Sequence, residues 1–196
     1  MNQSQVKDKL YELTSMFFQS AIVAWVEQTM TKPVVPYVTL RTGNINKTLF
    51  PCHDEAGDRY YPCSTIAEIN LYTKGRPRTV AEGVTGNYEN TATSDLMEFV
   101  KFLESGEIQN RIAAANMDIQ LNPPIRDLTE LLNDSKYRYR AMAEFTVSYM
   151  EKASGRYGVS DCMYIPNYSG GNTKEFAVAS QYEIKEVEVK EDVDNE

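Results

Sequence analysis

The residues of this chain best suited to chemistry lie close together in one polar segment. Cys52, His53, Asp54 and Cys63 are all potential zinc ligands. Structural zinc sites use cysteines and histidines at characteristic short spacings, and these four residues match no such pattern. His53 is also the only histidine in the chain, so no second imidazole is available. The spacing therefore predicts no metal site here.

Three other kinds of site are also unsupported by the sequence. Asp54, Glu55 and Asp58 lack the alternating spacing of a calcium-binding loop. A Gly-x-Ser-x-Gly nucleophile motif is missing, and Gly83 and Gly86 are followed by no Lys-Ser/Thr pair that would make a phosphate loop. Carboxylates are abundant, but nothing singles out a catalytic pair. The sequence therefore predicts a protein that is not an enzyme and that uses no cofactor.

Composition and net charge narrow the range of possible functions further. The chain has 196 residues, 42% hydrophobic residues and a net charge of −8, which is typical of one folded, acidic domain rather than of a general nucleic-acid binder. Its three cysteines indicate reduced thiols in a cytosol-like compartment. The longest uncharged run, residues 13–26, is too short and too polar to cross a bilayer, and the N-terminus shows no targeting signal. We expect a protein without a membrane partner.

One long strand dominates the pattern of the chain. From Tyr137 to Met150, aromatic and small apolar residues alternate with mixed and charged ones, including Arg138 and Arg140. Successive strand side chains point to opposite faces, so one face is apolar and the other is polar. About fourteen residues is more than twice the usual strand length. A strand of this length in a small acidic protein without catalytic groups indicates a component of an assembly.

The N-terminal residues 4–30 are predicted to form one helix, because apolar residues recur at steps of three and four. From Met16 onward a second apolar face appears, which includes Phe18, Ile22 and Trp25. Either the rest of the fold or a neighbouring subunit must cover that face, and the sequence leaves both alternatives open.

The remaining pattern predicts an order of elements α-β-β-β-α-β-α-β. Prolines lead into an edge strand, and a polar turn follows to make a hairpin arm. A helix begins at Ser94 or Asp95 and stops at Gly106, and a short helix precedes the long strand. The fold class is α/β (α+β), with a mixed, mostly antiparallel sheet flanked by the N-terminal and second helices. The predicted strands are residues 35–42, 45–50, 64–73 and 117–121, the polar turn is 52–60, and the short helix is 127–132.

Two segments outside this core are candidates for contacts. The loop of residues 74–91 carries Lys74, Arg76 and Arg78, which could contact DNA or an acidic partner or could simply be solvated. Residues 153–196 form a C-terminal extension beyond the domain of residues 1–152, with a further strand at 176–189. Its tyrosine-rich loop, with Tyr164 and Tyr168, suits either a protein–protein contact or internal packing.

Three segments of the chain resemble a known family. They are Pro-Tyr-Val-Thr-Leu-Arg at residues 36–41, Ala-Glu-Ile-Asn-Leu-Tyr-Thr at residues 67–73, and Ile-Arg-Asp-Leu at residues 125–128 together with Tyr-Arg-Tyr-Arg-Ala at residues 137–141. In this order they resemble the neck and tail-terminator (tail-completion, head–tail joining) proteins of tailed bacteriophages. The resemblance covers about residues 5–150. It consists of several short segments that occur in the same order as in the family, and not of one decisive motif.

The resemblance implies a subunit of a ring, typically a homohexamer, at the head-proximal end of the phage tail. Such a ring stops growth of the tail tube, docks onto the head connector and lets DNA pass through its centre without specific binding. The protein would then belong to the virion, after assembly in the host cytoplasm. Arg126, which with Asp127 is predicted to cap the short helix, could instead join Arg138 and Arg140 at the subunit interface.

Two rival functions remain at this point. In the same class, the chain could be another neck ring, such as a head-completion protein or a subunit that initiates the tube. In a different class, it could be a small cytosolic enzyme or ligand-binding α/β domain, which predicts a monomer or dimer with a polar pocket.

Overall fold

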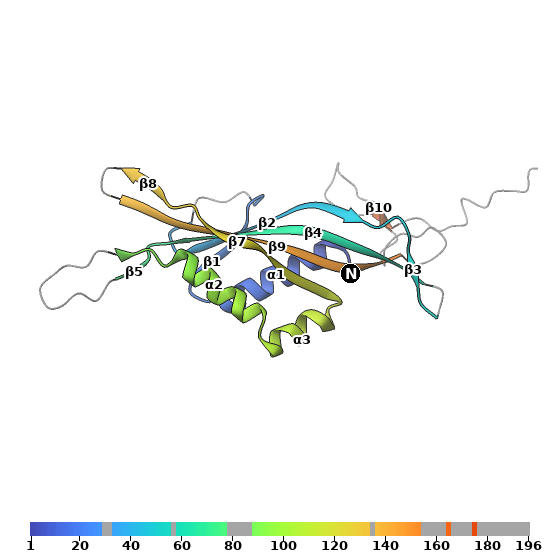
Figure 1. Cartoon of the computed structure of the whole chain (residues 1–196). Coiled ribbons are helices and arrows are strands. Elements are labelled where there is room, and N and C mark those ends of the chain that lie inside the picture. Colours follow the sequence, from blue (N-terminus) through green and yellow to red (C-terminus); the bar gives the residue numbers. More distant parts are fainter. Residues whose placement is uncertain are drawn as a thin grey trace, which may run out of the picture.

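The computed structural model describes residues 1–28, 33–55, 58–77, 88–133, 136–153, 164–165 and 174–175. These residues form a mixed α+β fold in which a seven-stranded, mostly antiparallel sheet carries three helices on one face (Figure 1). The main path of the sheet is β1-β2-β4-β9-β7, with β3 paired to β4 and β8 paired to β9. The predicted fold class is therefore confirmed.

The elements have the following bounds. The helices are α1 (Gln3–Phe17), α2 (Ala92–Leu103) and α3 (Gly106–Ala114). The sheet contains β1 (Ile22–Trp25), β2 (Tyr37–Lys47), β3 (Cys52–His53), β4 (Arg59–Thr73), β7 (Met117–Asp127), β8 (Glu130–Asn133) and β9 (Lys136–Ala153). Two short antiparallel pairs stand apart from it: β5 (Arg76–Pro77) with β6 (Tyr88–Glu89), and β10 (Tyr164–Ile165) with β11 (Lys174–Glu175).

The two longest strands form the centre of the sheet. β9 has 18 residues and β4 has 15, and they pair from Arg59 opposite Ala153 to Thr73 opposite Tyr139. The predicted alternation along β9 is confirmed, because Ala141, Ala143 and Phe145 are at most 1% exposed and face the helices. The strand is longer than predicted at both ends.

The core lies between the sheet and the helices. The apolar stripe of α1 (Val6, Leu10, Leu13) and that of α2 (Leu96, Phe99, Val100, Leu103) belong to one buried cluster with the inner residues of β4 and β9. The ring of Phe99 lies edge-on to Phe145, with 6.2 Å between the ring centroids. The predicted stripe of α2 is thus confirmed.

The prediction of one N-terminal helix over residues 4–30 is wrong. The helix ends at Phe17, where the N–H of Phe18 donates to the carbonyl oxygen of Thr14. Residues 22–25 instead form β1, which runs parallel to β2. Ile, Val and Trp favour strands with a half-buried face. Residues 22–25 pair with the edge of β2, and the local periodicity of the sequence does not reveal this partner.

Two predictions about the second half of the chain are also wrong. Gly106 does not end the structure of α2 but begins α3, which the sequence did not predict. The expected short helix at residues 127–132 is absent, and β8 pairs there with the start of β9. Leu131 lies opposite Tyr137, so a cross-strand pair has replaced a helical turn whose local signal was weak.

Strand lengths differ from the predictions because register shifts let two strands continue. β2 includes the first half of the predicted segment 45–50, up to Lys47, through a shift between Thr42 and Ile45. β7 continues past Pro123 and Pro124 through a shift between Asn122 and Arg126. β2 is not the outermost strand at its start either, since β1 pairs with its first four positions. Bulges of this kind accommodate residues that cannot join a regular ladder.

The long strands extend beyond the helices at both ends of the molecule (Figure 1). At one end lie β5 and the β8–β9 hairpin, and at the other lie the turn between β2 and β3 and the β3–β4 hairpin. The turn between β2 and β3, together with the β3–β4 hairpin, is the predicted hairpin arm. The predicted strand at residues 176–189 lies outside the described residues.

Candidate partner interface

The three segments that carry the family resemblance meet at one place in the sheet. Tyr37 of β2 lies opposite Tyr72 of β4, and Tyr72 lies opposite Arg140 of β9. These residues lie on the face of the sheet that faces away from the helices, which we call the open face. Segments separated by up to about 100 positions in the sequence are therefore neighbours in space.

Three of the predicted interface residues gather on this open face. Arg138 and Arg140 are two positions apart on β9, and Arg126 of β7 lies opposite Met142, the next residue of the same face. We call these three residues the arginine cluster. Their side chains are 25%, 24% and 52% exposed, respectively, so solvent or a partner can reach each of them. The prediction that Arg126 caps a short helix is wrong, because no helix follows it.

Carboxylates accompany each arginine of the cluster. Arg126 Nη1 lies 3.8 Å from Glu144, and Glu130 lies 3.7 Å from Arg138 and 3.8 Å from Arg140. These separations exceed hydrogen-bonding distance, so the attraction is electrostatic and weak in contact with water. An acidic group of a partner could therefore compete with Glu130 or Glu144 for the guanidinium groups.

Arg140 is fixed more firmly than the other two arginines. Its Nε and Nη2 both donate to Oδ1 of Asn70, at 3.1 and 2.8 Å, and its guanidinium lies 5.3 Å from the ring centroid of Tyr72. Asn70 is only 2% exposed and donates through Nδ2 to Glu68 at 2.7 Å. The ring of Tyr72 stacks on Tyr37 at 4.4 Å. Burial, followed by the nearby Tyr72, raises the pKa of Tyr37, so this ring stays neutral at physiological pH.

The other predicted interface residues are separated by the fold. Phe18 is only 9% exposed and packs on Phe17 and Phe99, so it belongs to the core. Trp25 is half-buried on the helix side of β1, where Lys7 Nζ lies 5.0 Å from its ring. Ile22 stays exposed opposite Tyr37, but β2 and β4 separate its strand from β9 and the arginine cluster. Tyr164 lies in β10, and Tyr168 lies outside the described residues.

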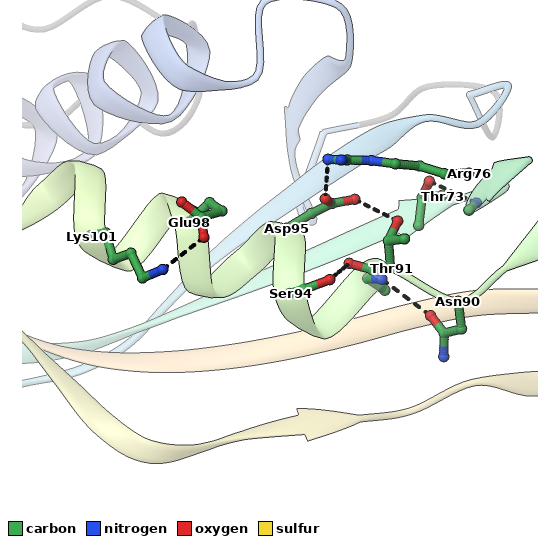
Figure 2. A network of polar contacts seen from close by, with 10 residues as sticks. Thr73, Arg76, Asn90, Thr91, Ser94, Asp95, Glu98 and Lys101 are labelled. Carbon is green, nitrogen blue, oxygen red and sulfur yellow. Dashed lines mark hydrogen bonds and ion pairs between the residues drawn. The ribbon is translucent and has the colours of Figure 1, made fainter. Parts of the chain in front are cut away.

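The predicted cationic loop is partly tied to α2. Figure 2 shows Arg76 of β5 reaching Asp95 near the start of α2, with 2.6 Å between Nη2 and Oδ1. The other oxygen of Asp95 accepts a hydrogen bond from Thr91 Oγ1 at 2.8 Å. Lys74 is exposed, and Arg78 lies outside the described residues. Arg76 therefore helps to anchor the base of the loop, while Lys74 remains accessible to an acidic partner.

Sequence reasoning missed one exposed apolar pair. Leu49 and Phe50, at the turn between β2 and β3, are 87% and 82% exposed. The signal was present, because two large apolar residues stand before Pro51 at a polar turn. A side-chain pair of this size in open solvent is typical of a contact surface.

Cavities adjoin both ends of the sheet. One of about 560 Å³ lies near the β2–β3 end and is lined in part by Ser64, Asp118 and Ser148. The other, of about 270 Å³, lies at the opposite end, where Phe17 and Phe18 follow one another at the end of α1. Within the described part of the chain, no three histidine, cysteine, aspartate or glutamate side chains lie close enough to hold a metal ion.

Within the same described ranges, no helix is long and apolar enough to cross a membrane. Comparison with known proteins adds no assignment, since no family model and no curated protein matches the chain.

Proposed function

We propose that this chain is a structural protein of a phage virion: a tail-terminator or neck ring that ends growth of the tail tube and joins the tail to the head connector. The proposed unit is a homo-oligomeric ring, and the expected number of subunits is six. DNA would pass through its centre, and the chain itself would carry out no catalytic step.

The observation that carries this proposal is the meeting of the three resembling segments on the open face. Residues 36–41, 67–73 and 137–141 supply Tyr37, Tyr72 and Arg140, and the ring of Tyr72 contacts both Tyr37 and Arg140. Tyr37 is buried beneath this site, but Tyr72 and Arg140 are half-buried and can be reached by a partner. A fixed arginine beside a tyrosine suits a protein contact, because Tyr and Arg are enriched at interfaces. Subunits of a ring need such surfaces on two sides.

The shape of the subunit supports the same proposal. β4 and β9 extend past the helices at both ends, so each subunit presents two arms rather than a closed outline (Figure 1). Ring closure requires two different surfaces that meet head to tail around a rotation axis. The net charge of −8 fits a ring through which DNA slides, because an acidic bore does not hold phosphates.

The ligand-binding rival is favoured by one observation, the 560 Å³ cavity, whose size is that of a small-molecule pocket. Residues from four strands line it, β2, β4, β7 and β9, among them Ser64, Asp118 and Ser148. A ligand-binding domain would work as a monomer or dimer, whereas the ring must assemble. The oligomeric state therefore separates the two functions.

The test is the mass of the purified protein by light scattering, followed by electron-microscope class averages. A particle near six times 22.3 kDa with a central hole is the expected result. Because a terminator could close only on a tube end, a monomer is then mixed with purified tail tubes. A monomer that neither caps nor binds the tubes would refute the ring and favour the ligand-binding rival.

A further inference from the structure

The second half of β2 is an edge of the sheet without a strand on its outer side among the described residues. β1 pairs with β2 from Tyr37 to Leu40, and β4 pairs with the other side of β2 as far as Lys47. Beyond Leu40, β2 continues past β1 toward the end of the molecule where β3 lies (Figure 1). We call residues 41–47 the β2 edge.

The backbone of the β2 edge directs polar groups outward. The N–H of Thr48 donates to the carbonyl oxygen of Pro62 at 3.0 Å, so these two residues form a hydrogen-bonded pair. Such pairs alternate along an antiparallel ladder, which makes the pairs of Lys47 and Ile45 with β4 non-hydrogen-bonded. The N–H and C=O groups of Ile45 and Lys47 therefore face away from β4. Groups in this position are a template to which a further strand can add.

The sequence supplies a segment that suits this edge. Residues 176–189 have the alternating pattern of a strand, and they follow directly on Glu175, the last residue of β11. A strand that pairs with residues 42–47 needs a length of about 20 Å. The segment 176–189 is more than twice as long as this part of β2, so it is long enough to cover the edge.

The start of this segment lies within reach of the β2 edge of its own chain. β9 leaves the sheet at Ala153, opposite Arg59, which is four positions along β4 from the partner of Lys47. Four residues and two strand spacings correspond to about 13 Å and about 10 Å, respectively. Glu175 pairs with Tyr164, so the eleven residues that join Ala153 to this pair span about 40 Å when fully extended. The segment therefore meets its own β2 edge at a high effective concentration, which a second copy lacks.

Charge distinguishes the β2 edge from the opposite edge of the sheet. Residues 41–48 include Arg41 and Lys47, both exposed, and no acidic residue. Lys47 Nζ lies 3.6 Å from the ring centroid of Tyr61, a contact that keeps the positive charge in place. Residues 176–196 contain seven acidic residues and two lysines. The opposite edge, residues 117–122 of β7, has Asp118 as its only charged residue, so it repels an acidic segment that the β2 edge attracts.

We propose that residues 176–189 add to the β2 edge of the same chain as a further antiparallel strand. The segment begins at the end of the molecule where β2 finishes, so it runs back along β2 in the opposite direction. Pairing gives partners to the outward N–H and C=O groups of Ile45 and Lys47. The inference concerns a single subunit and does not depend on the ring function proposed above.

The test is backbone hydrogen exchange of the full chain, followed residue by residue by NMR. The N–H groups of Ile45 and Lys47 should exchange at least about tenfold more slowly in the unchanged chain than in a variant with both Val178→Pro and Ala179→Pro. Two adjacent prolines are needed because N–H groups alternate in direction along a strand, so one of the two positions faces β2.

The matched control carries Val193→Pro and Asn195→Pro. These two substitutions also add two prolines to the C-terminal part of the chain, but they lie beyond residue 189. Exchange at Ile45 and Lys47 should therefore be the same in this variant as in the unchanged chain.

A second measurement needs no variant and decides the question if the Val178→Pro and Ala179→Pro chain does not fold. In the unchanged chain, nuclear Overhauser contacts should join the backbone of Ile45 and Lys47 to residues 176–189. These contacts should persist when the protein is diluted, because both strands belong to one chain.

Three results would overturn the inference. The first is rapid exchange at Ile45 and Lys47 in the unchanged chain while β4 and β9 stay protected. The second is slow exchange that survives Val178→Pro and Ala179→Pro, which would mean that something else covers the β2 edge. The third is protection that disappears on dilution, which would assign the added strand to a second copy.

Discussion

Arg140 donates two hydrogen bonds to the same oxygen of Asn70, at 3.1 and 2.8 Å, across 70 positions of sequence. The pair joins the two longest strands of the sheet on the open face, where no helix covers it among the described residues. A buried amide oxygen that depends on one guanidinium is costly to leave unpaired, because water cannot easily replace the lost donor. This link therefore contributes to the stability of the sheet as well as to the candidate interface.

Arg140→Ala should lower the free energy of unfolding by about 1–3 kcal/mol, since it leaves Oδ1 of Asn70 without its donors. Arg138→Ala is the control, because Arg138 makes a loose ion pair with Glu130, with 3.7 Å between Nη1 and Oε2. It should cost less than about 1 kcal/mol. Urea unfolding followed by circular dichroism measures both. Equal losses in the two variants would show that the Asn70 link contributes nothing of its own.

Phe145→Ala should cost about 3–5 kcal/mol of unfolding free energy, because it opens a cavity beneath α2 where Phe145 is 1% exposed. The same substitution at Phe50, which is 82% exposed, should change stability by less than about 0.5 kcal/mol. Denaturant unfolding at low protein concentration, where subunits are separate, compares the two. A large loss at Phe50 in the monomer would mean that the Phe50 ring packs within its own chain.

The phenol of Tyr149 should make stability fall at alkaline pH. Burial raises its pKa to about 12, with smaller contributions from Cys63 and Glu151, and its hydroxyl has no hydrogen-bond partner in the described structure. Below pH 10 Tyr149 holds its proton in both the folded and the unfolded chain, so the contribution of this residue to stability is fully present. Above about pH 10 the unfolded chain loses the proton first, and stability declines as pH approaches about 12.

Tyr149→Phe removes this group, and with it a buried hydroxyl that lacks a partner. We expect the variant to be at least as stable as the unchanged chain at about pH 8 and to lose less stability by about pH 11. Part of the decline should remain, because burial also raises the pKa of the Cys63 thiol. Urea titrations at the two pH values provide the measurement. An identical pH slope in both proteins would show that Tyr149 ionises at its ordinary pKa.

Gly75→Ala should disrupt the β5–β6 pair that supports the cationic loop. Gly75 has a φ of +76°, and an added Cβ would lie 2.1 Å from the carbonyl oxygen of Glu89. The expected cost is about 1 kcal/mol or more. Gly106→Ala, at the start of α3, meets nothing within 4 Å and should be neutral or slightly stabilising. Thermal unfolding would rank the two, and the opposite order would contradict this account of the turn.

Periodic patterns in the sequence predicted the buried face correctly where one pattern runs through a whole helix or strand. The alternation of β9 and the helical stripe of α2 fixed which of their residues are buried, because each side chain direction follows from its neighbours in sequence. The prediction failed at short segments whose partner is distant. Residues 22–25 continue an apolar pattern that fits a helix, but β2 lies beside them and pairs with them as a strand.

The residues of the candidate interface also show the difference between local patterns and distant pairing. Arg126, Arg138 and Arg140 lie in the segments that carry the family resemblance, and the register of β7 and β9 places all three on one face of the sheet. Phe18 and Trp25 were predicted at an interface because they add a second apolar face to the expected N-terminal helix. They pack instead toward the helix side of the sheet, because that helix ends at Phe17.

The sequence by itself determined an acidic, mixed α+β protein with one long central strand and a core made by its apolar face and α2. Only the tertiary structure decided where α1 ends, that residues 130–133 form a strand, and that Tyr37, Asn70, Tyr72 and Arg140 meet. The physical reason is the range of the forces involved. Local periodicity sets the direction of each side chain, whereas strand register and the pairing of buried polar groups depend on residues far apart in the chain.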